Sequence, residues 1–318
     1  MTQHGNTVAF TPTRLPRRRN TAYATAVQRH PAFLPFAAAA LGIATFSVMD
    51  VAMKSASLTI GVYTAMLVRC AIGSAIMLPI WLLGGGRWPS GPTFRVHLTR
   101  SAVSAAMATL FFWGLVRTPV AEAIALSFIS PLIALYLASV LLGEKIERRA
   151  IAASVLGLVG VAVIALAPSA PEAAPRSPLG IAAILASAVF YAWNLILQRQ
   201  QAQAADPREV AFFQNALVGV ILAVAAPWLL LRPDLATLGT ITTAAVLVTA
   251  SLMLLSWAYA RAEAQALVPF EYTAFIWAAL FGWVWFGERV TTATLGGAAL
   301  IVVGCLIATR SRTEQTAL

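Results

Sequence analysis

Four ionisable side chains lie inside long apolar stretches of this sequence, where a charge is costly and usually serves a function. Glu271 sits in the middle of an aromatic, apolar stretch, two residues after Pro269. Arg69 is embedded in another such stretch. Asp50 and Lys54 stand four residues apart and therefore share one face of a helix. These side chains are the first candidates for chemistry.

Each of these residues has a functional and a structural interpretation. Pro269 removes a helical hydrogen bond and can open the helix, so the Glu271 carboxyl could bind a substrate amino group or accept a proton. Alternatively, Glu271 makes a hydrogen bond between helices. Arg69 can hold a carboxylate with two parallel bonds, or it can partner a helix end or Asp50. Asp50 and Lys54 could instead form an ion pair near the outer interface, with Lys54 extending to water.

Neutral polar residues form a second pattern. Tyr191, Asn194 and Gln198 follow at i, i+3 and i+7, which places them on one face of a helix. Asn215 corresponds to Arg69 in a repeat, since 215 − 69 = 146. Such residues also join helices within membranes. Their presence in corresponding stretches of both halves favours a binding role.

Aromatic residues flank the same stretches and either line a cavity or belong to the interfacial belt of a membrane protein. Glu122 and Glu263 stand near the ends of apolar stretches and are interpreted as interfacial partners of Arg117 and Arg261. The predicted substrate-binding residues are Arg69, Tyr191, Asn194, Asn215, Trp257, Glu271 and Tyr272.

These residues must be positioned by membrane helices. The 318-residue chain is 59% hydrophobic and 11% charged, against roughly 25% charged in soluble proteins. A bilayer crossing needs about 20 apolar residues. Ten such spans are predicted, at 33–54, 59–83, 98–117, 120–142, 149–168, 179–199, 209–231, 238–260, 264–286 and 291–309. The fold class is therefore an all-α integral membrane protein.

The chain contains a duplicated unit. Trp113-x3-Arg117 followed by Gly143-Glu144-Lys145 recurs as Trp257-x3-Arg261 followed by Gly287-Glu288-Arg289. The offset is constant, because 257 − 113 = 144 and 288 − 144 = 144. An offset held over dozens of residues indicates repetition. We expect Glu144 and Glu288 to cap or tether the helices that follow them, and Ser127 takes the position of Glu271 in the first copy.

The duplication divides the chain. We predict a disordered basic cytoplasmic tail at 1–32, a first repeat at 33–168, a proline-rich periplasmic linker at 169–178, a second repeat at 179–309 and a cytoplasmic tail at 310–318. With the N-terminus inside, inner segments carry 16 Lys and Arg residues and outer segments carry 5. This bias predicts a multi-pass inner-membrane protein with both termini in the cytoplasm.

Five spans per repeat is an odd number, so the second repeat should enter the membrane inverted relative to the first. Inverted repeats around a central cavity are typical of secondary transporters. No nucleotide-binding P-loop, metal-ligand spacing or disulfide framework is present in the sequence, so no cofactor or metal is expected. The basic residues lie in short loops, which argues against nucleic acid as a partner.

The ten spans and the paired Gly-Glu-basic tripeptides, Gly143-Glu144-Lys145 and Gly287-Glu288-Arg289, resemble the drug/metabolite transporter superfamily in its EamA branch. Lys54 and Arg69 also fit that pattern. The segment from Pro269 to Glu288 is similar to bacterial exporters of amino acids, including aromatic ones. The resemblance implies an inner-membrane carrier with a cavity between its halves.

We therefore expect a monomeric exporter of small metabolites, namely aromatic and other neutral amino acids, that works by alternating access. Membrane lipids and H+ are the other expected partners. Relatives of the branch also carry S-adenosylmethionine, purines and drugs, so another metabolite is an alternative. A membrane-embedded enzyme would need paired catalytic groups at one depth, and a passive channel or scaffold would not need the duplication.

Overall fold

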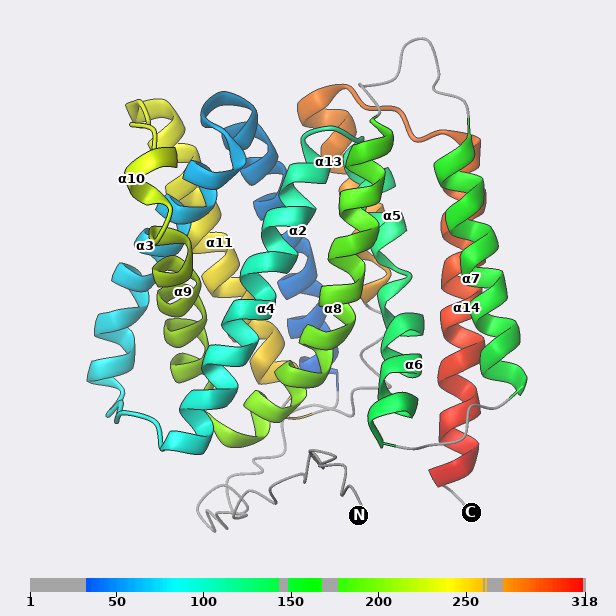
Figure 1. Cartoon of the computed structure of the whole chain (residues 1–318), viewed down its shortest axis with the longest axis horizontal. Helices are drawn as coiled ribbons and strands as arrows, with labels where there is room; N and C mark the ends of the chain where they lie inside the picture. Colours follow the sequence, from blue (N-terminus) through cyan, green and yellow to red (C-terminus); the bar gives the residue numbers. More distant parts are fainter. Residues whose placement is uncertain (1–32, 143–147, 168–176, 260, 262–270, 317–318) are drawn as a thin grey trace, which may run out of the picture. The chain divides into compact units, whose positions relative to one another are not determined.

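The computed structural model describes residues 33–142, 148–167, 177–259, 261 and 271–316, and these form helices joined by turns. Residues 33–318 group as one compact unit, apart from residues 1–32. The first half contains α2 (Leu34–Ile60), α3 (Val62–Leu83), α4 (Gly91–Leu115), α5 (Val120–Ser127), α6 (Ser130–Leu142) and α7 (Arg148–Leu166) (Figure 1). The second contains α8 (Pro178–Ala204), α9 (Pro207–Ala223), α10 (Ala226–Leu229), α11 (Leu235–Tyr259), α13 (Ala274–Phe286) and α14 (Thr292–Thr316).

Several helices begin where the sequence provides an N-cap. Asp206 accepts a hydrogen bond from the backbone N–H of Arg208 at 2.9 Å, with Pro207 as the first helical residue of α9. Thr291 accepts from the N–H of Thr294 at 3.1 Å at the start of α14. Asp234 accepts a hydrogen bond from the N–H of Thr237 at the start of α11. Its hydrogen bonds with Thr237 lower the pKa of its carboxyl.

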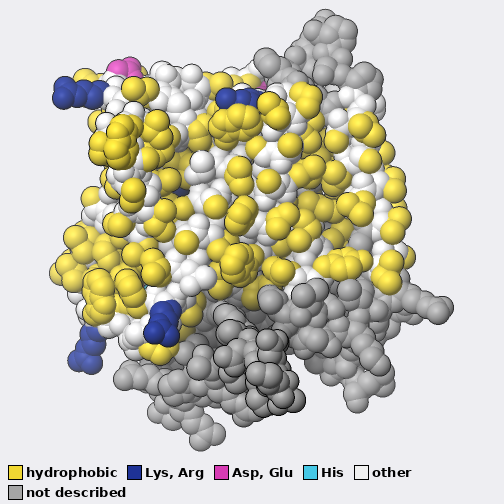
Figure 2. Space-filling model, viewed as in Figure 1, with side chains coloured by type: hydrophobic (Ala, Val, Ile, Leu, Met, Phe, Trp, Pro, Cys, Tyr) yellow, Lys and Arg dark blue, Asp and Glu magenta, His cyan; other side chains and the backbone are white. Residues whose placement is uncertain are grey.

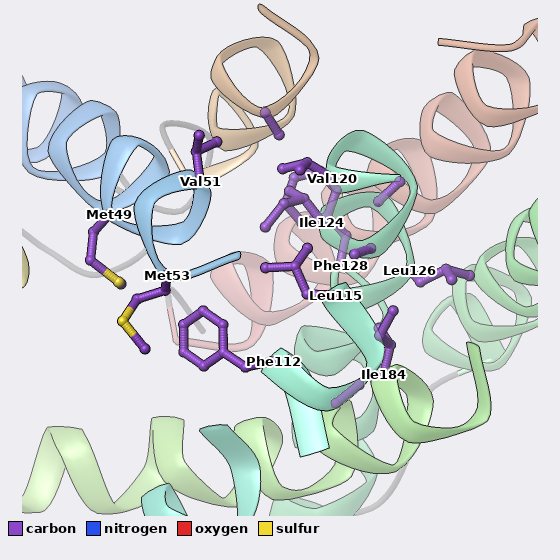
Figure 3. Close-up of a cluster of buried hydrophobic side chains, with 14 of the residues drawn as sticks. Met49, Val51, Met53, Phe112, Leu115, Val120, Ile124, Leu126, Phe128 and Ile184 are labelled. Atoms are coloured by element: carbon purple, nitrogen blue, oxygen red, sulfur yellow. The ribbon is translucent and has the colours of Figure 1, made fainter. Parts of the chain in front are cut away.

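The surface and core of this unit are both apolar. Figure 2 shows hydrophobic side chains across the visible face, with Lys and Arg side chains toward its upper and lower ends. A core cluster draws on both halves; Met53, Phe112, Ile124 and Ile184 belong to it (Figure 3). Four described helices, α2, α3, α8 and α11, are long and apolar enough to cross a membrane. A bundle that is apolar inside and outside is a membrane protein.

Helices of one half pack against helices of the other half, and the set of pairs stays the same when the two halves are exchanged. The most extensive pairings are α2 with α11, α4 with α8, α3 with α9, and α7 with α14. The first helix of each half thus packs on the third apolar span of the other half. Ser251 Oγ donates to Gly42 O at 2.7 Å in one pair, and Ser187 Oγ donates to Met107 O at 2.8 Å in the other. These bonds join positions that correspond to within one residue, since 251 − 107 = 144 and 187 − 42 = 145.

The α7–α14 pair depends on two glycines. The two helices run side by side in opposite directions (Figure 1). A Cβ on Gly160 would lie 2.6 Å from Gly297 O, and a Cβ on Gly297 would lie 2.6 Å from Gly160 O. Only hydrogen side chains permit this approach of the two backbones, as at other close helix contacts in membranes.

We predict that Gly297→Ala weakens the α7–α14 interface. The added methyl must displace a backbone carbonyl, at a cost of about 1–3 kcal/mol, measured as the free energy of unfolding in detergent. The matched control is Gly296→Ala, because nothing lies within 4 Å of a Cβ there. Both changes gain the same helix propensity. Equal stability of the two variants would contradict the close approach.

Candidate functional site

The site begins at two helix breaks in corresponding places. The predicted span 120–142 is divided into α5 and α6 at Phe128 and Ile129. Pro131 cannot donate to the carbonyl oxygen of Ser127, and the hydroxyl of Ser130 donates to that oxygen at 2.6 Å. Inside a membrane such a break is tolerated where local partners satisfy the freed backbone groups.

The second break lies at Tyr272 and Thr273, a turn directly before α13. The helices that follow the breaks begin at Ser130 and Ala274, and 274 − 130 = 144. Glu271 stands at the second break, as its sequence neighbourhood predicted; Pro269 lies outside the described residues. Discontinuous helices in corresponding positions of two halves are the usual mark of a transporter's substrate site.

The two breaks touch each other. The rings of Phe128 and Tyr272 pack edge to face, with centroids 5.2 Å apart. These residues correspond in the repeat, since 272 − 128 = 144. A residue can contact its own repeat partner only near the axis that relates the halves. The breaks therefore lie at the centre of the bundle, between the two halves.

A cluster of ionisable side chains lies close to these breaks. Tyr191 of α8 is within electrostatic range of Glu271, Asp50 and Arg100. Asp50 of α2 is 3% exposed and within electrostatic range of Arg69 of α3, which is 8% exposed. Asp50 Oδ1 and Arg69 Nε make no hydrogen bond with any described residue. Unused donors and acceptors on buried charged groups are where a polar ligand gains most.

Lys54 does not pair with Asp50, so the ion pair considered from the sequence is wrong. Lys54 Nζ lies 2.5 Å from Glu288 Oε1, and both side chains are 5% exposed. Lys54 Nζ also donates to Thr118 O at 2.7 Å. Helix geometry allowed the Asp50–Lys54 contact, but a partner 234 positions away in the chain satisfies Lys54 better. Because Lys54 does not pair with Asp50, we group Asp50 with the ionisable side chains near the breaks, which we call the central cluster.

Glu288 caps a helix, but one in the other half. Its Oε2 accepts a hydrogen bond from the N–H of Val120 at 2.6 Å, at the start of α5, where a carboxylate also meets the positive end of the helix dipole. Gly287, with φ of 66°, turns the chain at the end of α13 and allows Glu288 to fold back. Glu288 was expected to cap or tether the helix that follows it, but Thr291 caps α14. The Glu288 carboxylate instead binds Lys54 and the N–H of Val120 in the first half. Glu144 lies outside the described residues.

A second buried polar group joins α4, α8 and α9. Arg100 Nε donates to Asn194 Oδ1 at 3.1 Å, and Ser104 Oγ donates to the same oxygen at 3.0 Å. Arg100 also donates to Gln201 Oε1, and His97 lies between Gln201 and Glu209. His97 is 0% exposed and Arg100 4% exposed.

Sequence reasoning missed His97 and Arg100. The predicted span 98–117 begins directly after His97 and has Arg100 as its third residue, so neither was considered as a buried side chain. The helix starts at Gly91, after Ser90 and with Pro92 in its first turn. That Ser-Gly-Pro start was the available signal, because proline is favoured in the first helical turn.

Asn215, Trp257 and the polar face of α8 complete the set of predicted residues. Asn215 is buried against Gly73 of α3, and its Nδ2 donates to Ala211 O at 2.9 Å. Trp257, near the end of α11, lies under the Arg261 guanidinium at 4.3 Å. The corresponding Trp113 and Arg117 are stacked at 3.7 Å, so the repeated Trp-x3-Arg motif forms the same cation–π contact in both halves. Tyr191, Asn194 and Gln198 do share one face of α8, where Asn194 and Gln198 both accept from Arg100.

A duplicated helical bundle with an apolar surface, matched helix breaks and buried charges at its centre defines a membrane transporter. The chain belongs to the EamA-like transporter family, whose model matches residues 34–166 and 178–310. The two matches coincide with the two halves of the fold. This confirms the family that the Gly-Glu-basic tripeptides suggested.

The chain is similar over most of its length to transporters of different small molecules. The pseudopaline exporter CntI of Pseudomonas aeruginosa is 25% identical over 276 residues, which are 86% of this chain and 95% of that protein. A riboflavin transporter of Rhizobium johnstonii is 30% identical over 224 residues, 69% of this chain and 71% of that one. A crystal structure with 20% sequence identity shares the fold, with a TM-score of 0.60 over 88% of this chain and 99% of the other.

We predict that the Lys54–Glu288 ion pair contributes to the free energy of unfolding because each buried charge depends on the other as its counter-charge. Lys54→Met or Glu288→Gln alone leaves a buried partner without its counter-charge, which should lower the free energy of unfolding by about 3–5 kcal/mol. The double variant should lose less than either single variant. Unfolding in detergent measures all three, with Arg87→Gln, an exposed loop charge, as the control. Additive losses would contradict a direct interaction.

Proposed function

We propose that this transporter exports small zwitterionic metabolites, namely aromatic and other neutral amino acids, across the inner membrane. The observation that carries the proposal is the central cluster, which holds opposite charges in one buried region. Arg69 can bind a carboxylate, while Asp50 and Glu271 can bind an ammonium group. Asp50 Oδ1 and Arg69 Nε keep hydrogen-bonding capacity that no described residue uses.

The same cluster disfavours substrates that carry one charge or none. Such a substrate would leave one of the buried charged groups without a partner, which a site penalises more strongly than a missing apolar contact. Tyr191, Asn194 and Tyr272 would supply neutral polar and aromatic contacts around the substrate. Asn215 and Trp257 would act at greater distance, through the α3–α9 contact and the end of α11.

The proposed mechanism is alternating access by two inverted five-helix repeats. The exchange-symmetric pairing of helices, the contact between Phe128 and Tyr272 and the opposed directions of α7 and α14 support it. In this arrangement the halves rock about the central site, which opens to one face and then the other. The linker at 169–178 would be periplasmic and both tails cytoplasmic.

The substrates named for the relatives favour a second candidate function, in which the same site binds a different metabolite. One relative is named as an exporter of pseudopaline and another as a transporter of riboflavin. Members of one family thus carry dissimilar molecules. S-adenosylmethionine, purines and drugs are therefore the competing substrates for this chain.

Counterflow in proteoliposomes tests the substrate. We expect labelled phenylalanine to exchange, and phenethylamine and 3-phenylpropionate, which each lack one of its charged groups, to exchange at least tenfold less, a difference of about 1.4 kcal/mol. Arg69→Lys, which keeps the charge but loses the planar fork, should raise the KM for phenylalanine about tenfold. Equal exchange of all three compounds, or exchange of purines alone, would reject zwitterion recognition. Exchange of S-adenosylmethionine alone, which carries the same ammonium and carboxylate groups, would reject neutral amino acids as the substrates.

Proton coupling is expected at Glu271. Glu271→Gln keeps the shape of the side chain but cannot take up or release a proton, so exchange by this variant should not depend on pH. Wild-type exchange should depend on pH, and so should that of Glu122→Gln, a carboxyl replaced in the first turn of α5. Initial rates across a pH series in proteoliposomes measure this. A Glu271→Gln variant with the wild-type pH profile would reject the role.

A further inference from the structure

The buried polar network of α4, α8 and α9 has a fixed direction of hydrogen bonding. Arg100 can only donate, because a guanidinium has no acceptor. The atom of Gln201 that faces Arg100 is therefore its carbonyl oxygen, Oε1. The amide Nε2 of Gln201 then lies on the other side, 2.5 Å from His97 Nδ1, and must be the donor of that bond.

The direction of these hydrogen bonds determines which ring nitrogen of His97 carries the proton. His97 Nδ1 faces a donor, so it accepts and carries no proton. The proton of the imidazole is then on Nε2, which donates to Glu209 Oε1 at 3.0 Å. The chain of bonds runs from Glu209 through His97 and Gln201 to Arg100, and each step depends on the one before. The ring of Phe213 stacks on His97 with centroids 4.9 Å apart and holds its plane.

We propose that His97, held in its Nε2–H tautomer, is a positioning residue that keeps Arg100 beside Asn194 and Tyr191. His97 does this through the amide of Gln201, whose orientation it fixes. The role in transport rests on the proposed function, in which Asn194 and Tyr191 meet the substrate. The tautomer itself does not depend on the substrate.

The alternative tautomer, with the proton on Nδ1, is incompatible with this network. A proton on Nδ1 would face the Gln201 amide donor, and two donors repel at that distance. The amide would have to turn, which would present its NH2 to the donor-only guanidinium and release Arg100. Glu209 of α9 is a charged contact of His97, while α8 contributes the neutral Gln201, which links His97 to Arg100 of α4.

Nitrogen NMR of the imidazole tests the tautomer directly. The sequence has three histidines, so the double substitution His4→Gln and His30→Gln leaves His97 alone. With ¹⁵N-histidine in nanodiscs at neutral pH, we expect one protonated nitrogen, Nε2, and one unprotonated nitrogen, Nδ1. A proton on Nδ1, with or without one on Nε2, would overturn the inference.

A near-isosteric change provides the matched test. Gln201→Glu replaces the amide NH2 with an acceptor oxygen and keeps the oxygen that faces Arg100. His97 Nδ1 should then become a donor, so its nitrogen signal should change from unprotonated to protonated. Glu209→Gln is the control, because its amide oxygen still accepts from Nε2–H and the tautomer should stay as it was. An unchanged Nδ1 signal in Gln201→Glu would contradict the network.

Transport separates this inference from the proposed function. Gln201→Leu breaks the link to Arg100 and should raise the KM for phenylalanine several-fold with little change in maximal rate. If wild type moves no amino acid but shows the Nε2–H tautomer, only the proposed substrate fails. If it transports and Nδ1 carries the proton, or if Gln201→Leu folds and transports with wild-type KM, the positioning role fails.

Discussion

The cost of burying charge in an apolar helical bundle governs this structure. Each buried ionisable group must be paired, or it must be held for a substrate or proton. Lys54 and Glu288 are paired with each other, and each also bonds a backbone group of the first half, Thr118 O for Lys54 and Val120 N–H for Glu288. Asp50 and Arg69 keep unused hydrogen-bonding atoms. The first kind of group joins the two halves of the bundle, and the second kind is where we propose that the substrate binds.

Duplication explains where that centre lies. The two copies supply helix breaks at the same place, and these meet through Phe128 and Tyr272. Because the copies differ at Ser127 and Glu271, one break carries a carboxyl and the other a hydroxyl. A symmetric frame therefore surrounds an asymmetric site. The repeated Trp-x3-Arg stacks show that outside the centre the copies keep the same local chemistry.

Much of the fold could be predicted from the sequence, because it depends on patterns that are local or periodic. Apolar run lengths predicted the helices, the constant offset predicted the duplication, and the proline before Glu271 indicated a break. The partners of buried groups could not be predicted. Whether Lys54 meets Asp50 or Glu288 depends on which helices face each other, and that is decided by packing of the whole bundle. His97 and Arg100 were missed because a charged or polar residue at the edge of an apolar run has the same sequence pattern whether it lies in a loop or in a buried helix turn. The inverted orientation and the substrate remain predictions.

The Lys54–Glu288 pair has a consequence for how such a carrier rests between cycles. In the other half, the position of Lys54 is occupied by Gln198, since 198 − 54 = 144, and an amide cannot form an ion pair. In the alternating-access mechanism proposed above, a motion that separates Lys54 from Glu288 would break a buried ion pair at a cost of several kcal/mol, and Gln198 can contribute no equivalent ion pair. The two open conformations of the proposed mechanism should therefore differ in energy. Without substrate, the population is expected to favour the conformation in which Lys54 and Glu288 stay together.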